Sequence, residues 1–198
     1  RRQLMKAYGA ELVLTDGAKG MKGAIAKADE LAKEIPNSFV PGQFVNPANP
    51  DAHKRTTGPE IWEDTDGKVD IFVAGVGTGG TVTGVGETIK AWTNDVRIAA
   101  VEPYESQALG GGLTGPHGIS DLGYGFVPEN FNAYVVDNVV AVNTTDAQRA
   151  AQKVLRTDAI PASVASGAVL QAAAQLIHVG ASRSALAILP GRQIVNTL

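Results

Sequence analysis

The residues best suited to chemistry lie in one glycine-rich segment, Gly75-Val-Gly-Thr-Gly-Gly-Thr81, which follows an apolar run and precedes a helical pattern. Glycines let a chain turn tightly and approach a ligand closely. Successive backbone N–H groups in such a turn can point at one anion, and the N-terminus of the following helix adds to the attraction. Thr78 and Thr81 can add hydroxyl donors, so the segment predicts a phosphate-binding loop.

The kind of phosphate stays open on this segment alone. The residue directly before Thr81 is Gly80 and not a lysine, which excludes a Walker A loop. Gly75, Gly77 and Gly80 have the spacing of a dinucleotide-binding fingerprint. That fingerprint expects an acid at the end of the next strand, and the position of Glu102 fits this loosely. Nucleotide and non-nucleotide phosphates therefore remain alternatives, beside a plain strand-to-helix turn with no ligand.

Other chemistry has little support in the sequence. The three histidines, His53, His117 and His178, are far apart and share no ligand spacing, so we predict no metal site. Ser106 and Ser120 lack the Gly-x-Ser-x-Gly context of a hydrolase nucleophile.

Composition narrows the class of protein further. The 198 residues carry a formal net charge of -3 with no basic block, so we expect no nucleic-acid partner. No apolar run approaches the roughly 20 residues that span a bilayer, and we expect no membrane partner. The absence of cysteine fits a cytoplasmic protein. The chain begins at Arg1 without an initiator methionine, and we expect its natural start to lie upstream.

The elements that must position the glycine segment are strands alternating with helices. Residues 69–75 are apolar on both faces, as in a buried parallel strand. Prolines predict a loop at residues 46–50, and weak periodicity predicts another at 104–132. The remaining predicted strands are 11–15, 97–101, 133–142 and 185–189, and the predicted helices are 1–8, 21–34, 53–63, 83–93, 144–156 and 166–179, with Thr144 and Ser166 as N-caps.

Strands that alternate with helices imply βαβ units. We therefore expect an α/β fold of three layers, with a mostly parallel sheet and helices on both faces. Residues 1–45 are expected to form part of a smaller α/β subdomain, with the loop at 46–50 as the seam, and residues 46–198 to form a larger domain.

The glycine segment also carries a family resemblance. Residues 75–84 resemble the phosphate-binding loop of cysteine synthases (O-acetylserine sulfhydrylases) and cystathionine β-synthases, which are fold-type II pyridoxal-phosphate enzymes. The segments 11–25, 43–50, 56–62 and 123–128 resemble further parts of the same family, so the likeness covers nearly the whole chain. The chain resembles the C-terminal portion of such an enzyme.

The resemblance implies a fold and an activity. The family is a two-domain α/β enzyme that binds pyridoxal 5'-phosphate between its domains, so residues 1–45 would belong to the small mobile subdomain and 46–198 to the large cofactor-binding domain. The implied reaction is a β-replacement that makes L-cysteine from O-acetylserine and sulfide. The implied assembly is a cytoplasmic homodimer, and the C-terminal tail of serine acetyltransferase is a candidate partner.

Site residues follow from the resemblance position by position. Gln43 matches the glutamine that helps to hold the substrate carboxylate, Phe44 matches its neighbour on the pocket wall, and Gly123 matches a glycine near the amino-acid substrate. The positions that match the cofactor's phosphate cradle are Gly77, Thr78, Gly79, Gly80 and Thr81.

The chain also departs from the family pattern. The lysine that forms the Schiff base with the cofactor would lie upstream of Arg1, so we expect no catalytic residue in this chain and no activity from it alone. The family serine that faces the pyridine nitrogen matches Ala165. Ser166 would bind the cofactor there only if the register shifts by one residue, and otherwise it caps a helix.

These departures keep other functions open. Within the class, the alternative is cystathionine β-synthase or another β-replacement enzyme. Outside it, a relative without the lysine could bind the cofactor or a partner without catalysis. A nucleotide-binding oxidoreductase is a more distant third interpretation.

Overall fold

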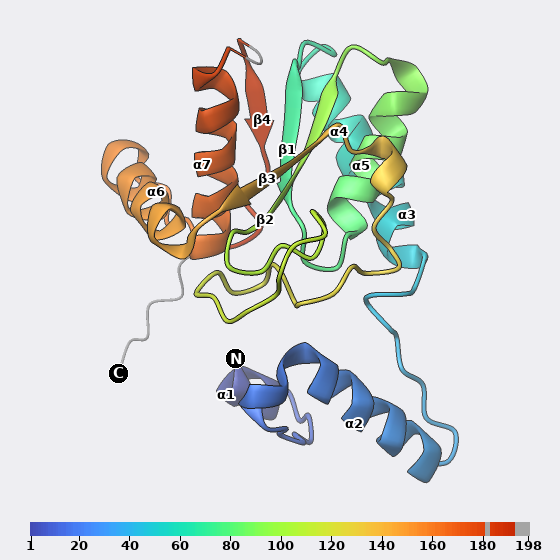
Figure 1. Cartoon of the computed structure of the whole chain (residues 1–198). Coiled ribbons are helices and arrows are strands. Elements are labelled where there is room, and N and C mark those ends of the chain that lie inside the picture. Colours follow the sequence, from blue (N-terminus) through green and yellow to red (C-terminus); the bar gives the residue numbers. More distant parts are fainter. Residues whose placement is uncertain (181–182, 193–198) are drawn as a thin grey trace. The chain divides into compact units, whose positions relative to one another are not determined.

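The computed structural model describes residues 1–180 and 183–192. It divides into two compact units, Arg1–Pro41 and Gly42–Leu198, which are described separately below (Figure 1). The boundary expected from the sequence lay a few residues later, between residues 45 and 46. In the structure, Gln43 and Phe44 therefore belong to the same unit as the glycine-rich segment.

The first unit consists of helices. Helix α1 spans Arg2–Ala7, the short 3-10 helix η1 spans Gly17–Lys19 and α2 spans Gly20–Glu34, close to the predicted bounds. The strand predicted at residues 11–15 is wrong, because residues 10–16 have no regular structure. A strand forms only by pairing with another, and residues 1–41, all of them described, contain no second strand.

The second unit is built on a four-stranded parallel sheet in the order β3-β2-β1-β4. Strand β1 is central and pairs with β2 on one side and with β4 on the other. The parallel sheet confirms the predicted α/β class. The strands are β1 (Ile71–Gly75), β2 (Arg97–Pro103), β3 (Asn138–Val142) and β4 (Ala185–Ala187).

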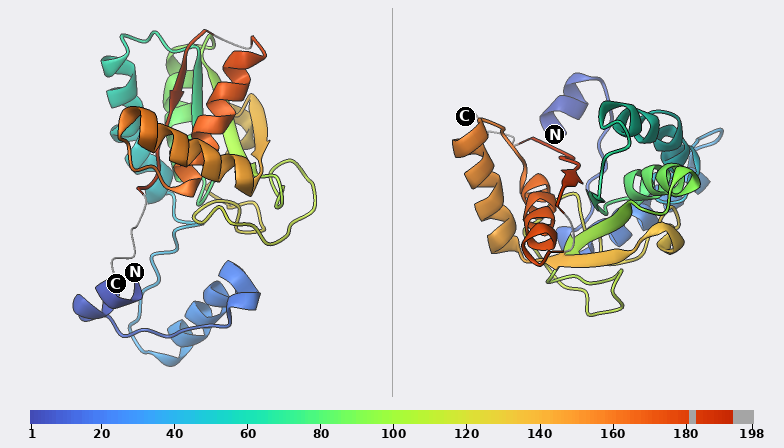
Figure 2. Two further views of the ribbon diagram at one scale, coloured as in Figure 1. Left: turned by 90° about the vertical axis from the view of Figure 1, so that its left-hand side faces the viewer. Right: turned by 90° about the horizontal axis from the view of Figure 1, so that it is seen from above.

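Helices lie on both faces of this sheet, as predicted (Figure 2). On one side are α3, α4 and α5, and on the other are α7 and, beside it, α6 (Figures 1 and 2). The helix bounds are α3 (Ala48–Arg55), α4 (Thr57–Asp64), α5 (Gly80–Trp92), α6 (Thr144–Asp158) and α7 (Val164–His178), and a 3-10 turn η2 (Ala133–Val135) precedes β3.

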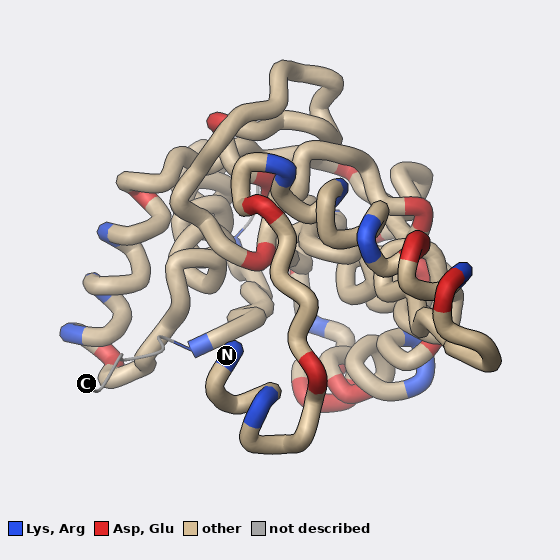
Figure 3. The backbone as a smooth tube through the Cα atoms, turned by 90° about the horizontal axis from the view of Figure 1, so that it is seen from below, with Lys and Arg blue, Asp and Glu red and all other residues tan. Residues whose placement is uncertain are grey.

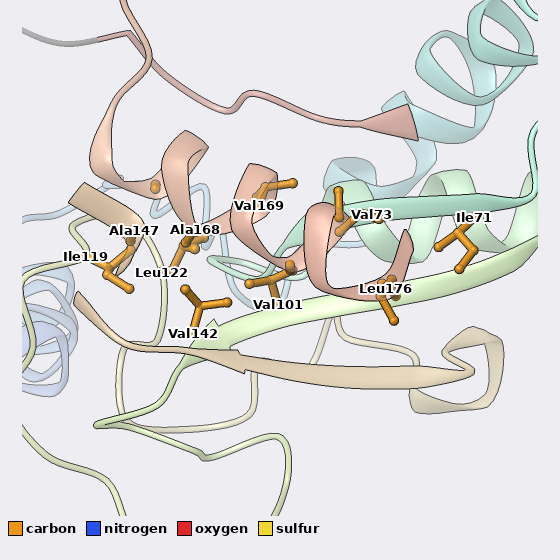
Figure 4. Close-up of a cluster of buried hydrophobic side chains, with 14 residues drawn as sticks. Ile71, Val73, Val101, Ile119, Leu122, Val142, Ala147, Ala168, Val169 and Leu176 are labelled. Atoms are coloured by element: carbon orange, nitrogen blue, oxygen red, sulfur yellow. The ribbon is translucent and has the colours of Figure 1, made fainter. Parts of the chain in front are cut away.

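The core has two parts because alternate residues of β1 point to opposite faces of the sheet. Ile71 and Val73 are fully buried on the side of α7, in one cluster with Val169 and Leu176 of that helix (Figure 4). Phe72 is fully buried on the other side, with Val82 of α5 among its neighbours in the cluster. Both faces of the strand are apolar for this reason, which is the pattern that predicted it.

The predicted loop at residues 46–50 is wrong in its second half, where α3 begins at Ala48 and includes Pro50. A proline is tolerated in the first turn of a helix because its missing N–H has no partner there anyway. The single helix predicted at 53–63 is instead two helices, which meet at Thr56 with φ -122° and ψ -77°.

Two predicted helix caps also need correction. Helix α6 is capped by Asn143 and not by Thr144, and α7 is capped by Ser163 and not by Ser166. In each case the capping side chain accepts a hydrogen bond from the N–H group of the third helical residue, Asp146 or Ser166. Thr144 and Ser166 therefore lie inside the first turn of their helices.

Residues 104–132 contain no helix or strand, which confirms the long loop expected there. Charges of both signs are interspersed along the chain (Figure 3). Across residues 1–180 and 183–192, no helix has the length and apolar character to cross a membrane.

Candidate functional site

The glycine-rich segment forms the connection from β1 to α5, as its sequence predicts. Gly79 is the N-cap of α5 in a left-handed conformation, with φ +86°. The first bond along this helix joins Thr83 N to Gly79 O at 3.1 Å, so the N–H groups of residues 80–82 have no intrahelical acceptor. No side chain caps this helix end and its first turn has no acidic residue. It therefore has the form of an anion-binding helix N-terminus.

Glycine is required in this loop because neighbouring segments come very close. A Cβ atom at residue 77, 79 or 80 would overlap atoms from parts of the chain that are distant in sequence. The obstructing atoms are Asp121 O for Gly77 at 2.5 Å, Phe131 N for Gly79 at 2.9 Å, and Asn49 Oδ1 for Gly80. The loop is thus packed between the start of α3 and the long segment that follows β2.

The two threonine hydroxyl groups of the loop are each contacted from α3. Asn49 Nδ2 donates to Thr78 Oγ1 at 2.8 Å, and His53 Nε2 lies 3.3 Å from Thr81 Oγ1. Burial lowers the pKa of His53, which favours the neutral imidazole at pH 7. Sequence reasoning missed both α3 residues. The signal that could have found them is their spacing of four residues, which places two polar side chains on one helix face.

The predicted substrate segment is fastened to the same region. The backbone carbonyl of Gln43 accepts from Asn49 Nδ2 and from Asn130 Nδ2, both at 2.9 Å. Asn130 N donates to Phe44 O at 3.0 Å. Because Asn49 also bonds Thr78, one side chain links the substrate segment to the glycine loop.

An aromatic wall, formed by Phe44, Tyr124 and Phe126, adjoins the loop. Phe44 is buried, and the centroid of its ring lies 5.4 Å from that of Tyr124 and 5.1 Å from that of Phe126, both edge-on. A Cβ atom at Gly77 would lie 3.7 Å from Tyr124 Cε2. The wall therefore extends from the predicted substrate segment to the predicted phosphate cradle. Sequence reasoning had not singled out Tyr124.

Gly123 is also brought to the glycine loop. Its N–H donates to the carbonyl of Val76 at 3.2 Å, and its φ of +62° favours glycine. Its own carbonyl lies 2.8 Å from His117 Nε2, while His117 Nδ1 accepts from Ile119 N at 3.2 Å. Since Nδ1 is an acceptor, Nε2 of the neutral ring carries the hydrogen and donates to Gly123. His117 thereby holds the turn that places Gly123 beside the loop.

Ser166 is buried at the start of α7, and its hydroxyl group already has partners. It donates to Gly191 O at 2.6 Å and accepts from Gly191 N at 3.2 Å. Ala165, which matches the family serine, is buried in the cluster that α7 forms with the sheet. The geometry gives Ser166 a structural task, the attachment of the segment after β4 to α7.

Glu102, the acid that a dinucleotide site would need, forms hydrogen bonds to the loop after β2. Glu102 is buried at the end of β2 and accepts from Leu109 N at 2.8 Å and from Gly110 N at 3.0 Å. Burial raises the pKa of its carboxyl group in spite of these two bonds. Its carboxylate therefore shapes the loop after β2 instead of facing a ribose. In the described part of the chain, no cluster of three His, Asp or Glu residues could hold a metal ion.

Comparison with known proteins agrees with this geometry. The model of the family described as "Pyridoxal-phosphate dependent enzyme" matches residues 1–191. The chain is 48% identical to cysteine synthase A of Escherichia coli (strain K12) over 89% of its own length and 57% of that protein. It is 46% identical to the cysteine synthase of Staphylococcus aureus (strain Mu50 / ATCC 700699) over 100% of this chain and 64% of that protein.

A solved structure is similar as well. The crystal structure of cysteine synthase from Entamoeba histolytica superposes with a TM-score of 0.88 at 44% identity, covering 96% of this chain and 57% of that one. The chain thus spans about three fifths of the length of the relatives that it matches. On its sequence, its fold and the geometry around the glycine loop, the chain belongs to the family of pyridoxal-phosphate dependent enzymes.

Proposed function

We propose that this chain is part of an enzyme that makes L-cysteine from O-acetylserine and sulfide with pyridoxal 5'-phosphate. The observation that carries the proposal is the open N-terminus of α5 beside the wall of Phe44 and Tyr124, in a chain 48% identical to a cysteine synthase. Together these features offer an anion cradle and an apolar surface at one place.

The residues present fit the phosphate group of the cofactor. Uncapped N–H groups at the start of α5 and two threonine hydroxyl groups are donors, and the glycines let the neighbouring segments pack closely around the loop. We assign the phosphate to residues 77–81. When bound, pyridoxal phosphate supplies an electron sink for the charge that develops on the substrate's α-carbon, and the protein contributes binding and orientation.

The substrate would bind between the loop and the segment around Phe44. We assign its carboxylate to Gln43 and one side of its pocket to the buried ring of Phe44, which excludes water there. We place Gly123 near the amino acid, in a left-handed turn where a Cβ atom would lie 2.5 Å from Pro103 Cδ. Ser166 remains a candidate for the cofactor's ring only if it gives up its bonds to Gly191.

The same proposal includes features outside the described site. The Schiff-base lysine would come from a part of the enzyme beyond this chain. Residues 1–45 would belong to a small mobile subdomain and 46–198 to the cofactor-binding domain. We further propose a cytoplasmic homodimer, and the C-terminal tail of serine acetyltransferase as a partner.

The test is a substrate comparison with the natural full-length protein. After loading with pyridoxal phosphate, it is given O-acetylserine with sulfide or with homocysteine, and the cysteine and cystathionine formed are quantified. We expect cysteine to form at the higher kcat/KM. A preference for homocysteine would instead make it a cystathionine β-synthase, and binding of the cofactor without either product would make it a non-catalytic relative.

A further inference from the structure

Helix α3 presents two polar side chains, one helical turn apart, to the two threonines of the glycine loop. Asn49 reaches Thr78 and His53 reaches Thr81. Residues four positions apart lie on the same helix face, so the pair forms a short row along α3. The row lies behind the hydroxyl groups that we assign to phosphate binding.

The direction of the first hydrogen bond is fixed by chemistry. An amide nitrogen only donates, so Thr78 Oγ1 is the acceptor of the bond from Asn49 Nδ2. The second hydrogen of the same nitrogen goes to Gln43 O. The hydroxyl hydrogen of Thr78 is not used in its bond to Asn49, and it can be donated to an anion.

The second contact depends on which nitrogen of His53 carries the hydrogen. The imidazole lies between two hydroxyl groups, with Nδ1 2.8 Å from Thr57 Oγ1 and Nε2 3.3 Å from Thr81 Oγ1. With the hydrogen on Nε2, Thr57 donates to the ring and the ring donates to Thr81, whose own hydrogen can go to an anion. With the hydrogen on Nδ1, Thr81 must donate its hydrogen to the ring.

Packing holds the imidazole in this position. A Cβ atom at Gly84 of α5 would lie 2.6 Å from His53 Cβ and would overlap the carbonyl of Pro50. The absence of a side chain at Gly84 thus lets α3 and α5 approach closely. The close contact between α3 and α5 holds His53 beside Thr81, and Thr57 on the other side of the ring begins α4.

We propose that Asn49 and His53 are positioning residues that turn both loop hydroxyl hydrogens toward the bound phosphate. Asn49 does so by donating to Thr78. His53 does so as the Nε2–H tautomer, in a chain that runs from Thr57 through the ring to Thr81 and then to the phosphate. Bonds in such a chain polarise one another, so Thr57 strengthens phosphate binding from the other side of the ring. This inference rests on the proposed cofactor site.

The experiment measures the apparent dissociation constant for pyridoxal phosphate by reconstituting the full-length apoprotein. We expect Thr81→Val and His53→Leu each to weaken binding about tenfold, since each removes a bond in a chain that ends on a charged group. Thr57→Val should weaken binding severalfold. The double variant Thr57→Val/Thr81→Val should be no weaker than Thr81→Val alone, because both act through one chain.

The matched control is Thr65→Val, at the other end of α4. The hydroxyl group of Thr65 donates to Ile61 O at 2.7 Å and has no part in the chain, so this variant should bind the cofactor like the unmodified protein. A second readout is the ¹⁵N NMR spectrum of the His53 side chain with saturating inorganic phosphate. We expect Nε2 to be the protonated nitrogen.

The outcomes separate this inference from the proposed function. Normal cofactor binding by Thr57→Val and His53→Leu, beside weakened binding by Thr81→Val, overturns the inference and leaves the phosphate site standing. Protonation of Nδ1 in the phosphate-bound state overturns it as well. If Thr81→Val binds pyridoxal phosphate normally, the loop is not the phosphate site, and both this inference and the proposed function are overturned. If His53→Leu does not fold, Thr57→Val and the NMR spectrum still decide.

Discussion

Replacement of Gly79 by alanine is expected to weaken binding of pyridoxal phosphate about a hundredfold. The residue has φ +86°, a conformation that costs an L-residue roughly 1–2 kcal/mol. The new Cβ atom would lie 2.9 Å from the backbone nitrogen of Phe131, and relief of that overlap costs about 1–3 kcal/mol more. To relieve this strain the loop would leave the geometry that binds the phosphate. Each 1.4 kcal/mol of strain then raises the dissociation constant about tenfold.

The measurement is cofactor content and affinity after dialysis of the full-length variant. Gly111→Ala is the matched control, because Gly111 has φ +73° and a Cβ atom there would meet nothing within 4 Å. It carries the same backbone penalty in open space, and its cofactor affinity should not change. Equal losses in the two variants would attribute the effect to general strain, and an unchanged Gly79→Ala would remove the loop from the site.

The 198-residue chain by itself is expected to form no cysteine above the uncatalysed background. The enzyme class needs a lysine that bonds the cofactor, and two lysines of the glycine loop's unit are held in ion pairs. Lys54 pairs with Glu87 at 2.5 Å and Lys90 pairs with Asp137 at 2.8 Å. Lys68 is exposed and forms an ion pair with the equally exposed Asp66 at 3.5 Å.

The test supplies this chain with pyridoxal phosphate, O-acetylserine and sulfide, and follows cysteine beside a cysteine synthase assayed in parallel. Reduction with borohydride and mass spectrometry then locate any lysine that has bonded the cofactor. We expect no single lysine to be labelled stoichiometrically. Turnover near that of the parallel enzyme, with one lysine labelled, would show that a lysine of this chain serves the cofactor.

Much of the large unit could be predicted because its elements are specified locally. Strand β1 is apolar on both faces, and only a buried parallel strand needs that pattern. The strand expected at residues 11–15 shows the limit of such reasoning. Its short apolar run, Leu12 to Leu14, satisfies the local pattern. A strand also needs a partner, however, and residues 1–41 provide none.

The candidate site likewise contains residues that the sequence could predict and residues that it could not. Gly77, Gly79 and Gly80 could be recognised because glycine, as a residue type, itself indicates that the backbone needs space for a close approach. Asn49 and His53 could not, because two prolines made residues 46–50 resemble a loop and hid the helical spacing of the pair. Only the three-dimensional contact with the two threonines gives them a role.

Glu102 shows how a spacing can mislead. It closes the strand after a glycine motif, which is the place of the ribose-binding acid in dinucleotide enzymes. In the fold its carboxylate accepts two backbone N–H groups of the loop that follows, a use that no spacing in the sequence could indicate.

The most direct test of the account is the position of the cofactor's phosphate in a crystal structure of the full-length protein grown with saturating pyridoxal phosphate. We predict that the phosphate lies at the N-terminus of α5, within hydrogen-bonding distance of backbone N–H groups of residues 77–81 and of the hydroxyl groups of Thr78 and Thr81. A phosphate bound elsewhere on the protein, or no bound cofactor at saturation, would contradict the account.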